Sequence, residues 1–290
     1  MTLSPGNASA AARSTAGRAP RRYFANVAQG TVLTEDQVPV PPRGRNAAGW
    51  LLGGRSGRGV RICLIDSGVE YAHQDIRNTG RSYTVAAGQA GQAEIVETGE
   101  LDVVGHGTAC ASVIGRIAPA AQLDSIRVLG PKNRGQGEAF LAALDWAIRQ
   151  KYNIINLSLS TRRIEHRARL LELAESGAAS GVLLVCSAHN SAVDSYPWTL
   201  SSVISVGSHE CPDAYEVQMN PDPPVEFYAG GVGVSVAWLG GTTRTMSGNS
   251  FAAPAIAASL ARIMEGYPGL RAWQYKYLLS LLATNVGRRR

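Results

Sequence analysis

The feature that most constrains the fold of this chain is a repeated alternation of continuous apolar segments with amphipathic ones. From Gly59 onward, short runs rich in Val, Ile and Leu alternate with longer segments whose apolar residues recur at helical spacing. Strands that are apolar on both faces belong in a parallel sheet covered by helices on both sides. The sequence therefore predicts an α/β fold with three layers and a doubly wound, mostly parallel sheet. The expected strands are 60–65, 123–129, 154–159, 182–188 and 203–206, and the expected helices are 107–117, 136–151 and 164–176.

Residues 1–45 differ in composition from the rest of the chain. The first 22 residues are rich in Ala, Ser, Gly and Arg and contain no acid, and residues 38–42 read Val-Pro-Val-Pro-Pro. Such segments lack the apolar surface needed to offset the entropy cost of ordering. We expect a disordered or extended tail and linker over 1–45, followed by one domain over 46–290. No secretory signal or 18-residue apolar run is present, so we expect a cytoplasmic protein without a membrane span.

The positive charge of the chain lies mainly at its two ends. The formal net charge is +6, of which residues 1–45 contribute +4 and the last three arginines contribute +3, leaving −1 for the remainder. A nucleic-acid groove needs its basic residues on the folded body. The charge distribution therefore argues against a nucleic-acid partner.

The cysteines indicate buried thiols rather than disulfides or a metal site. Three of the four lie in apolar strand or helix segments, where a thiol behaves as a small hydrophobe. We find no close Cys/His pairs of the kind that zinc requires, and we therefore expect no metal ligands. The four residues are Cys63, Cys110, Cys186 and Cys211.

An aspartate, a histidine and a serine stand at the ends of the expected elements. Asp66 ends the first strand, His106 opens a helix within Gly-His-Gly, and Ser250 lies at the first turn of a helix of small residues. We expect Pro254 in that same first turn, where no N–H partner is lost. Asp66 and His106, each taken alone, would be read as turn or cap residues. In the order Asp, His, Ser, they match a known order of the nucleophilic triad and would meet at one rim of the sheet.

With these motifs in this order, residues 59–268 resemble the subtilisin-like serine protease (subtilase) family. The resemblance implies a subtilisin-like fold and peptide hydrolysis through an acyl-enzyme on Ser250, with His106 as general base and Asp66 orienting it. Asn190 ends an apolar strand and stands where the family has its oxyanion-hole asparagine. The resemblance also implies that Cys110 lies as a thiol beneath the active site.

The resemblance implies a peptide substrate held in an extended conformation between two edge segments. His189 and Ser160 stand where the family usually has glycine, and both would narrow the primary pocket. Asp194 either faces that pocket and favours a basic residue at the cut, or caps its own turn. Arg134 would attract an acidic side chain two to four positions upstream of the cut. The edge residues are Asn133, Arg134 and Gly135 in one segment and Ser158, Leu159 and Ser160 in the other.

These observations lead to the interpretation of a serine endopeptidase, specialised for processing precursors or leader peptides inside the cell. The chemistry requires no cofactor. Calcium is common in the family, but no Asp/Asn cluster marks a site for it in this sequence. The alternative is a catalytically impaired subtilase-fold module for binding or regulation, which the residues at 160 and 189 would favour. The sequence makes no prediction of the oligomeric state.

Overall fold

The computed structural model describes residues 46–88, 92–99, 102–211 and 216–286. The chain divides into two units, Met1–Val38 and Pro39–Arg290, and every described residue belongs to the second. The expected tail and linker over 1–45 lies outside the described residues and stays a prediction. None of the described helices combines the length and the apolar character needed to cross a bilayer.

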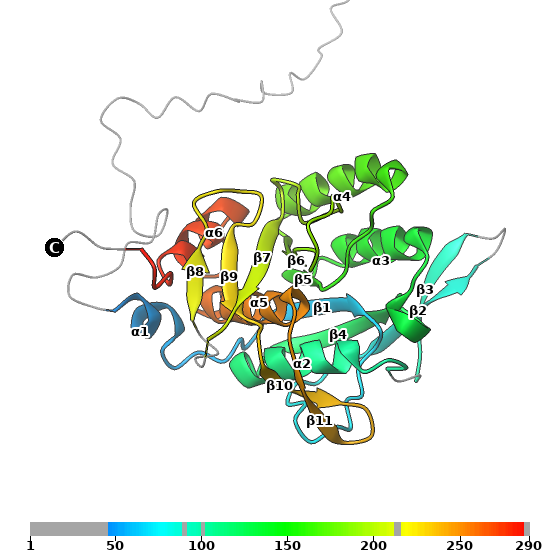
Figure 1. Cartoon of the computed structure of the whole chain (residues 1–290), viewed down its shortest axis with the longest axis horizontal. Coiled ribbons are helices and arrows are strands. Elements are labelled where there is room, and N and C mark those ends of the chain that lie inside the picture. The colour runs from blue at the N-terminus through cyan, green and yellow to red at the C-terminus, as the bar shows by residue number, and fades with distance from the viewer. Residues whose placement is uncertain (1–45, 89–91, 100–101, 212–215, 287–290) are drawn as a thin grey trace, which may run out of the picture. The chain divides into compact units, whose positions relative to one another are not determined.

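A nine-stranded sheet forms the centre of the second unit (Figure 1). Its strand order is β3-β2-β4-β1-β5-β6-β7-β9-β8. The seven inner strands pair in parallel, and β3 and β8 add antiparallel edges, so the predicted mostly parallel sheet is confirmed. The strands are β1 (Arg61–Asp66), β2 (Ser82–Ala87), β3 (Ala93–Glu97), β4 (Gln122–Arg127), β5 (Ile154–Leu157), β6 (Leu183–Ser187), β7 (Ile204–His209), β8 (Val217–Met219) and β9 (Phe227–Gly230).

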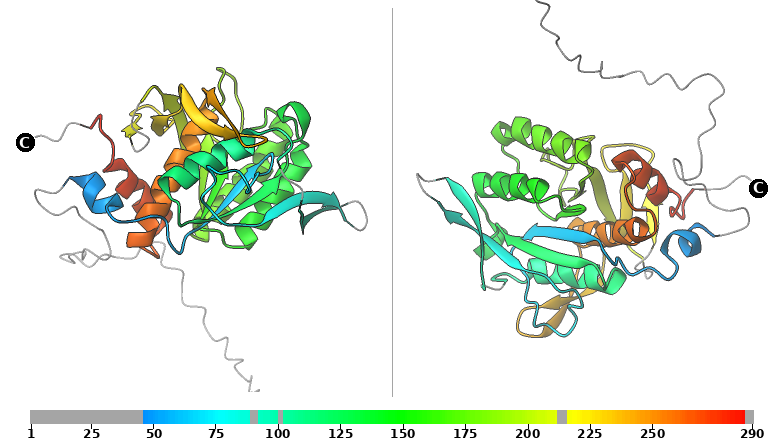
Figure 2. Two further views of the ribbon diagram at one scale, coloured as in Figure 1. Left: turned by 90° about the horizontal axis from the view of Figure 1, so that it is seen from below. Right: turned by 180° about the vertical axis from the view of Figure 1, so that it is seen from behind.

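Helices cover both faces of this sheet, which gives the three predicted layers (Figures 1 and 2). Ile62 and Leu64 of β1 pack with α2 and α5 on one face, while Cys63 and Ile65 pack with α3 and α4 on the other. This alternation along one strand explains why its sequence is continuously apolar. The helices are α1 (Ala47–Leu52), α2 (His106–Ile117), α3 (Gly137–Arg149), α4 (Arg167–Ala179), α5 (Asn249–Gly266) and α6 (Ala272–Ser280), with 3₁₀ turns η2 (Pro131–Asn133) and η3 (Ile164–His166).

The elements that the sequence did not predict are the partly exposed ones. In β3 and β11 no residue is fully buried, so neither shows the apolar run that identified the central strands. β10 (Val234–Trp238) and β11 (Thr242–Met246) form a separate antiparallel hairpin that leads directly into α5. The helix expected over 164–176 begins as η3 and continues as α4 to Ala179.

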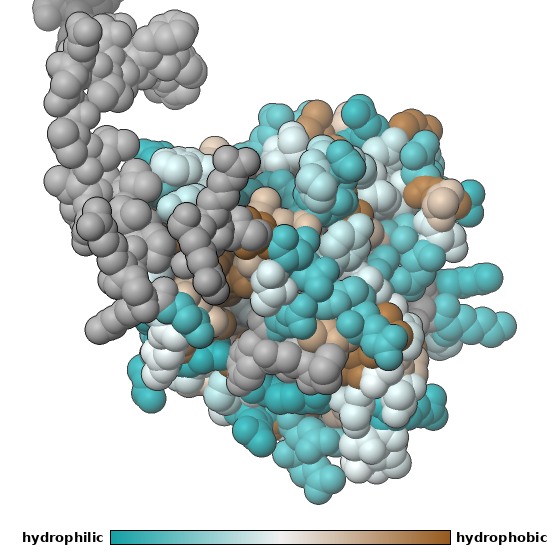
Figure 3. Space-filling model, turned by 60° about the vertical axis from the view of Figure 1, so that its left-hand side comes forward, coloured by the Kyte–Doolittle hydropathy of each residue, from teal (hydrophilic) through white to brown (hydrophobic). Residues whose placement is uncertain are grey.

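The surface of the described part carries few large apolar side chains. Figure 3 shows one face on which hydrophilic side chains are interspersed with small hydrophobic areas. Apolar side chains exposed singly are normal on a folded protein and indicate no interface by themselves. The exposed large hydrophobic residues are Val103, Ile164, Val232, Trp273 and Val286.

Candidate active site

A buried carboxylate and an imidazole form the first contact of the candidate site. Asp66 ends β1 and is fully buried, and its two oxygens lie 2.8 and 3.0 Å from Nδ1 of His106. Oδ1 also accepts a hydrogen bond from the backbone N–H of Ser67 at 2.8 Å. Since a carboxylate only accepts, Nδ1 of His106 carries the proton and Nε2 is left as the basic nitrogen.

The two glycines that flank His106 are required by close packing. Gly105 has a φ of 99°, and a Cβ there would lie 2.6 Å from the ring of Trp238. A Cβ on Gly107 would lie 2.1 Å from the backbone oxygen of Gly68. The Gly-His-Gly pattern therefore allows α2 to begin at the histidine, against the loop that follows Asp66.

Asp102 holds the loop that leads into α2, and sequence reasoning missed it. The side chain is buried, and Oδ1 accepts from the backbone N–H groups of Val104 and Gly105 at 2.8 and 2.9 Å. Oδ2 accepts from both the N–H and the hydroxyl of Thr108 at 2.9 and 2.8 Å. A carboxylate at this helix N-terminus also interacts favourably with the helix dipole. The signal in the sequence was an acid two, three and six residues before the residues that supply these donors.

The surroundings of His106 favour its protonated form. Burial by itself lowers the pKa of the imidazole, but the charge and hydrogen bond of Asp66, with a smaller effect of Asp102, raise the pKa above its ordinary value. An imidazolium formed during a reaction is thereby stabilised. Such a nitrogen is suited to accept a proton and to release it again.

Ser250 is held at the beginning of α5 by contacts to its backbone and its hydroxyl. Its Oγ donates to the backbone oxygen of Ser158 at 3.3 Å, while its own backbone oxygen accepts from Ser158 Oγ at 2.9 Å and Cys110 Sγ at 3.3 Å. His106 lines the same cleft, and its ring lies 5.7 Å from that of Phe251. Proton transfer requires the hydroxyl to turn toward His106, and such contacts commonly tighten only when substrate binds.

Pro254 has a different role from the one expected. Because α5 begins at Asn249, Pro254 is the sixth helical residue and lies beyond the first turn. It lacks the N–H that would bond to the backbone oxygen of Ser250 in a regular helix. That oxygen is therefore available to the hydroxyl of Ser158 and the thiol of Cys110. Pro254 thus allows the nucleophile to be anchored from outside its own helix.

Asn190 presents its amide group to the cleft in a fixed orientation. Its Oδ1 accepts from the backbone N–H of Asn249 at 2.9 Å, so its NH₂ group is the end that remains for a ligand. Asn249 in turn accepts from the N–H and hydroxyl of Ser208, both at 2.8 Å, and donates to the oxygens of Ala188 and His189 at 3.1 and 3.4 Å. Asn249 therefore connects β7, the Asn190 loop and α5, a function that the sequence did not reveal.

A cleft of about 600 Å³ brings together most of the residues singled out from the sequence. It lies at the carboxyl ends of β1, β4, β5 and β6, as expected for a parallel sheet. Asp66 stands behind His106 rather than in the lining, and the backbone of Asn133 belongs to η2. Arg163 also lines the cleft and was not predicted. The predicted residues in the lining are His106, Arg134, Gly135, Ser158, Leu159, Ser160, His189, Asn190 and Ser250.

The structure corrects the expectation for Asp194. This residue is exposed and lines a neighbouring hollow beyond Asn190, not the cleft. Among the described residues its carboxylate has no hydrogen-bond partner, so it does not cap its turn either. The loop is organised instead around buried Ser195, whose Oγ accepts from the indole of Trp198 at 2.8 Å. His189 lines both hollows and accepts from the N–H of Ser191 at 3.0 Å, which turns its ring toward its own loop.

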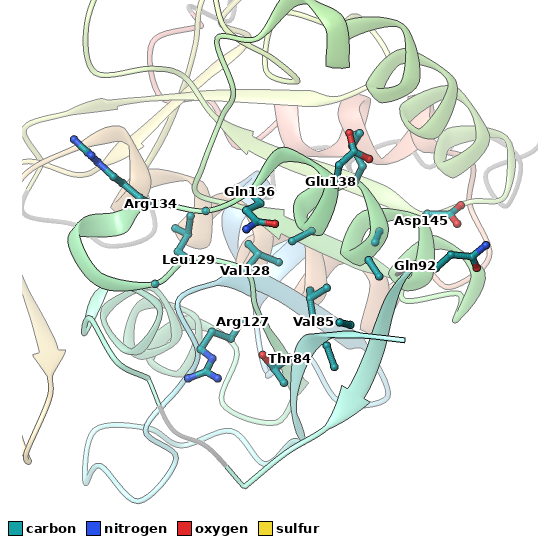
Figure 4. A pocket seen from close by; sticks show the side chains of 18 of the residues that line it. Thr84, Val85, Gln92, Arg127, Val128, Leu129, Arg134, Gln136, Glu138 and Asp145 are labelled. Carbon is teal, nitrogen blue, oxygen red and sulfur yellow. The ribbon is translucent and has the colours of Figure 1, made fainter. Parts of the chain in front are cut away.

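A second cavity of about 960 Å³ adjoins the cleft. Figure 4 shows it between the β2–β3 hairpin, which contributes Thr84 and Val85, and α3, which contributes Glu138 and Asp145. The segment around Arg134 separates the two cavities and lines both. The larger cavity contains neither the histidine nor the serine, so the smaller cleft is the site of chemistry.

The thiol next to the nucleophile belongs to Cys110. Cys110 is buried against Ser250, as expected, and burial raises the pKa of its thiol well above the usual range.

Within the described residues, two groups of three His, Cys or acidic side chains lie close enough to share an ion. Both contain a thiol and an imidazole, which do not suit calcium. The groups are Asp66, His106 and Cys110, and His209, Cys211 and Glu216.

Comparison with known proteins agrees with this geometry. The model of the subtilase family matches residues 57–290. Subtilisin DY of Bacillus licheniformis is 28% identical over 249 residues, covering 81% of this chain and 87% of that protein. An intracellular serine protease of Paenibacillus polymyxa is 31% identical over 257 residues, covering 81% and 76%.

Solved structures show the same fold. A cold-adapted subtilisin-like serine proteinase superposes with a TM-score of 0.64 at 22% identity, covering 80% of this chain and 86% of that one. A psychrophilic protease superposes with a TM-score of 0.65 at 22% identity, covering 81% and 88%. With the family model matching most of the chain, this protein belongs to the subtilase family and is a subtilisin-like serine peptidase.

Proposed function

We propose that this peptidase is a selective processing endopeptidase that prefers an acidic side chain upstream of the bond it cleaves. The proposal rests on the positive charge of the residues that line the cleft. Among the described residues, its lining contains the guanidinium groups of Arg134 and Arg163 and no carboxylate. Cationic groups in a cleft attract an anionic side chain of the substrate, although Glu165 lies 3.5 Å from Arg163 and partly offsets its charge.

The chemistry follows from the arrangement of Asp66, His106 and Ser250. Nε2 of His106 takes the proton from Ser250 Oγ, which attacks the scissile carbonyl carbon and forms a tetrahedral intermediate. Asn190 Nδ2 and the backbone N–H of Ser250 donate to the oxyanion. The imidazolium then gives its proton to the leaving amine as the C–N bond breaks. Water, deprotonated by the same nitrogen, hydrolyses the acyl-enzyme and regenerates Ser250.

The substrate would bind as an extended strand between the two edge segments. Arg134 and Gly135 lie on one side of the cleft, and Ser158 and Ser160 lie on the other. Backbone hydrogen bonds to such edges supply affinity, whereas the side chains at the edges supply selectivity. Residues farther upstream would reach the adjoining cavity past Arg134 (Figure 4).

The proposal places the enzyme inside the cell, with a precursor or leader peptide as substrate. Its support is limited to the cysteines and one relative. All four cysteines are thiols in the structure, which is typical of proteins in a reducing compartment. A relative that is 31% identical is an intracellular serine protease. The alternative of an impaired binding module is disfavoured because the contacts of Asp66, His106 and Asn190 are complete.

A peptide library with charged residues at each upstream position tests the proposal. We expect acidic residues to be favoured two to four positions before the cut, and Arg134→Glu and Arg163→Glu each to reverse that preference. For exposed pairs the effect is under about 1 kcal/mol, or about fivefold, and it weakens with salt. Arg162→Glu is the matched control, because Arg162 is exposed beside Arg163 but does not line the cleft. A preference for basic residues, or one unchanged by both variants, would contradict the proposal.

A further inference from the structure

A cluster of three different metal-ligating side chains lies outside the active site. His209 ends β7, Cys211 follows two residues later, and Glu216 immediately precedes β8. Their ligand atoms, one nitrogen, one sulfur and one oxygen, all lie within 4.8 Å of one another. No close Cys/His pair was expected from the sequence, although His209 and Cys211 are only two residues apart.

Strand pairing explains why these residues meet. β9 lies between β7 and β8 in the sheet, with His209 opposite Gly230 and Val217 opposite Ala229. The end of β7 and the beginning of β8 are therefore fixed at the same level of β9. This convergence depends on two strands that the sequence did not predict.

Glu216 is oriented as a ligand by hydrogen bonds to one of its oxygens. Oε1 accepts from Gln218 Nε2 at 2.9 Å and from Thr284 Oγ1 at 3.0 Å. The other oxygen, Oε2, lies 2.6 Å from Cys211 Sγ. Metal-binding carboxylates are commonly held in this way by outer hydrogen bonds.

His209 supplies an independent observation that points to a ligand. Its Nδ1 lies 3.1 Å from the backbone oxygen of Glu210, which can only accept, so Nδ1 is the protonated nitrogen. Nε2 then carries a lone pair, and this atom is buried without a hydrogen-bond partner among the described residues. Buried polar atoms are normally satisfied. Metal-bound histidines typically donate their other N–H to a backbone carbonyl, as His209 does.

We propose that His209, Cys211 and Glu216 bind a Zn²⁺ ion. Thiolate, imidazole and carboxylate together are ligands that zinc accepts at tetrahedral geometry, with a fourth position open to water. Zn–S and Zn–O bonds of about 2.3 and 2.1 Å at tetrahedral geometry place the sulfur and the oxygen about 3.6 Å apart. Because Cys211 Sγ and Glu216 Oε2 are 2.6 Å apart in the structure, the carboxylate of Glu216 must move back by about 1 Å to bind the ion. The ion replaces the thiol proton of Cys211, which is released to solvent. All three residues are partly exposed, which gives the ion access.

The site is positioned to stabilise the part of the fold that carries the nucleophile. The backbone oxygen of His209 accepts from Gly231 N–H at 3.2 Å, and the oxygen of Gly231 accepts from Gly248 N–H at 2.8 Å. Gly248 is the residue before α5. An ion that fixes the end of β7 therefore also restrains the start of the helix that contains Ser250.

Binding of Co²⁺, used as a spectroscopic substitute for Zn²⁺, tests the proposal on the full, metal-depleted chain. We expect one ion per chain with a thiolate-to-cobalt charge-transfer band, displaced by Zn²⁺. Cys211→Ser and Glu216→Gln should each remove the band or weaken binding at least a hundredfold. Glu210→Gln is the matched control, because its exposed carboxylate is next to the cluster but is not a ligand. The other cluster is tested by Cys110→Ser, which should leave the band unchanged.

Thermal unfolding of the Ser250→Ala chain provides a second readout, free of self-digestion. Zinc at a hundredfold excess over its dissociation constant should raise the melting temperature by about 5 to 10 °C, and Cys211→Ser should abolish the rise. Two results would overturn the proposal. One is a chain that binds neither ion, and the other is a band lost in Cys110→Ser but kept in Cys211→Ser, which places the ion in the active site.

Discussion

Replacing Asp102 with asparagine should strongly destabilise the fold, although the substitution only exchanges one carboxylate oxygen for an NH₂ group. Both carboxylate oxygens of Asp102 face donors, with two backbone N–H groups on Oδ1 and the N–H and hydroxyl of Thr108 on Oδ2. Whichever way an amide is turned, its NH₂ group faces N–H donors. The substitution therefore removes acceptors and introduces repulsion inside a buried turn.

The magnitude follows from the number of lost contacts. At least two hydrogen bonds to a charged acceptor disappear, each worth about 1.5 to 3 kcal/mol. Loss of a negative charge near the first turn of α2 adds about 0.3 to 1 kcal/mol. We expect the free energy of unfolding to fall by about 3 to 7 kcal/mol, a large part of the total for a typical domain.

Urea unfolding in a Ser250→Ala background measures this loss without self-digestion. Asp145→Asn is the matched control, since its partly exposed carboxylate pairs with Arg149 at 3.0 Å and Arg169 at 3.5 Å. Surface pairs of this kind are worth at most about 1 kcal/mol. A loss below about 1 kcal/mol for Asp102→Asn, or one equal to that of the control, would refute the reasoning.

Three further predictions follow from the site and the tail. Asn190→Ala should lower kcat on the order of a hundredfold to a thousandfold, and an effect on KM alone in steady-state kinetics would show that Asn190 is not an oxyanion donor. Burial lowers the pKa of His106 but Asp66 raises it by more, so activity should rise with pH through a midpoint above that of an ordinary imidazole. Asp66→Asn should move this midpoint to lower pH and reduce kcat on the order of ten thousandfold, and a pH–rate profile that stays in place would contradict that assignment. Deleting residues 1–40 should leave the melting temperature nearly unchanged, and a truncated chain that cannot fold would show that the segment assists folding.

The central strands and the residues at their ends were predictable because their signal is local. Both faces of β1, β5 and β6 are buried, so nearly every consecutive residue in these strands is apolar and the strands can be recognised from the sequence. Asp66, His106 and Ser250 stand directly at the ends of such elements, and their order identified the family before the geometry was known. Asn190 follows β6 in the same way.

The parts that were missed depend on contacts between distant residues. Asn249 forms hydrogen bonds with Ser208 and with the Asn190 loop, which are 41 and about 60 residues away in the sequence. The residues next to Asn249 in the sequence do not indicate these partners. Asp194 was placed from its distance to Tyr196 along the chain, but the loop turns around Ser195 and directs Asp194 to another hollow. Pro254 was assigned to the first helical turn because the sequence could not show that α5 begins at Asn249.

Labelling with a fluorophosphonate probe tests the central claim most directly, because the probe reacts only with an activated serine. We expect one adduct per chain, located on Ser250 by mass spectrometry, and no labelling of Ser250→Ala or His106→Ala. Folding of both variants is checked by circular dichroism, so that a loss of labelling reports chemistry rather than unfolding. Undiminished labelling of Ser250→Ala, or a wild-type chain that folds but does not react, would contradict the claim that Asp66, His106 and Ser250 form an active nucleophile.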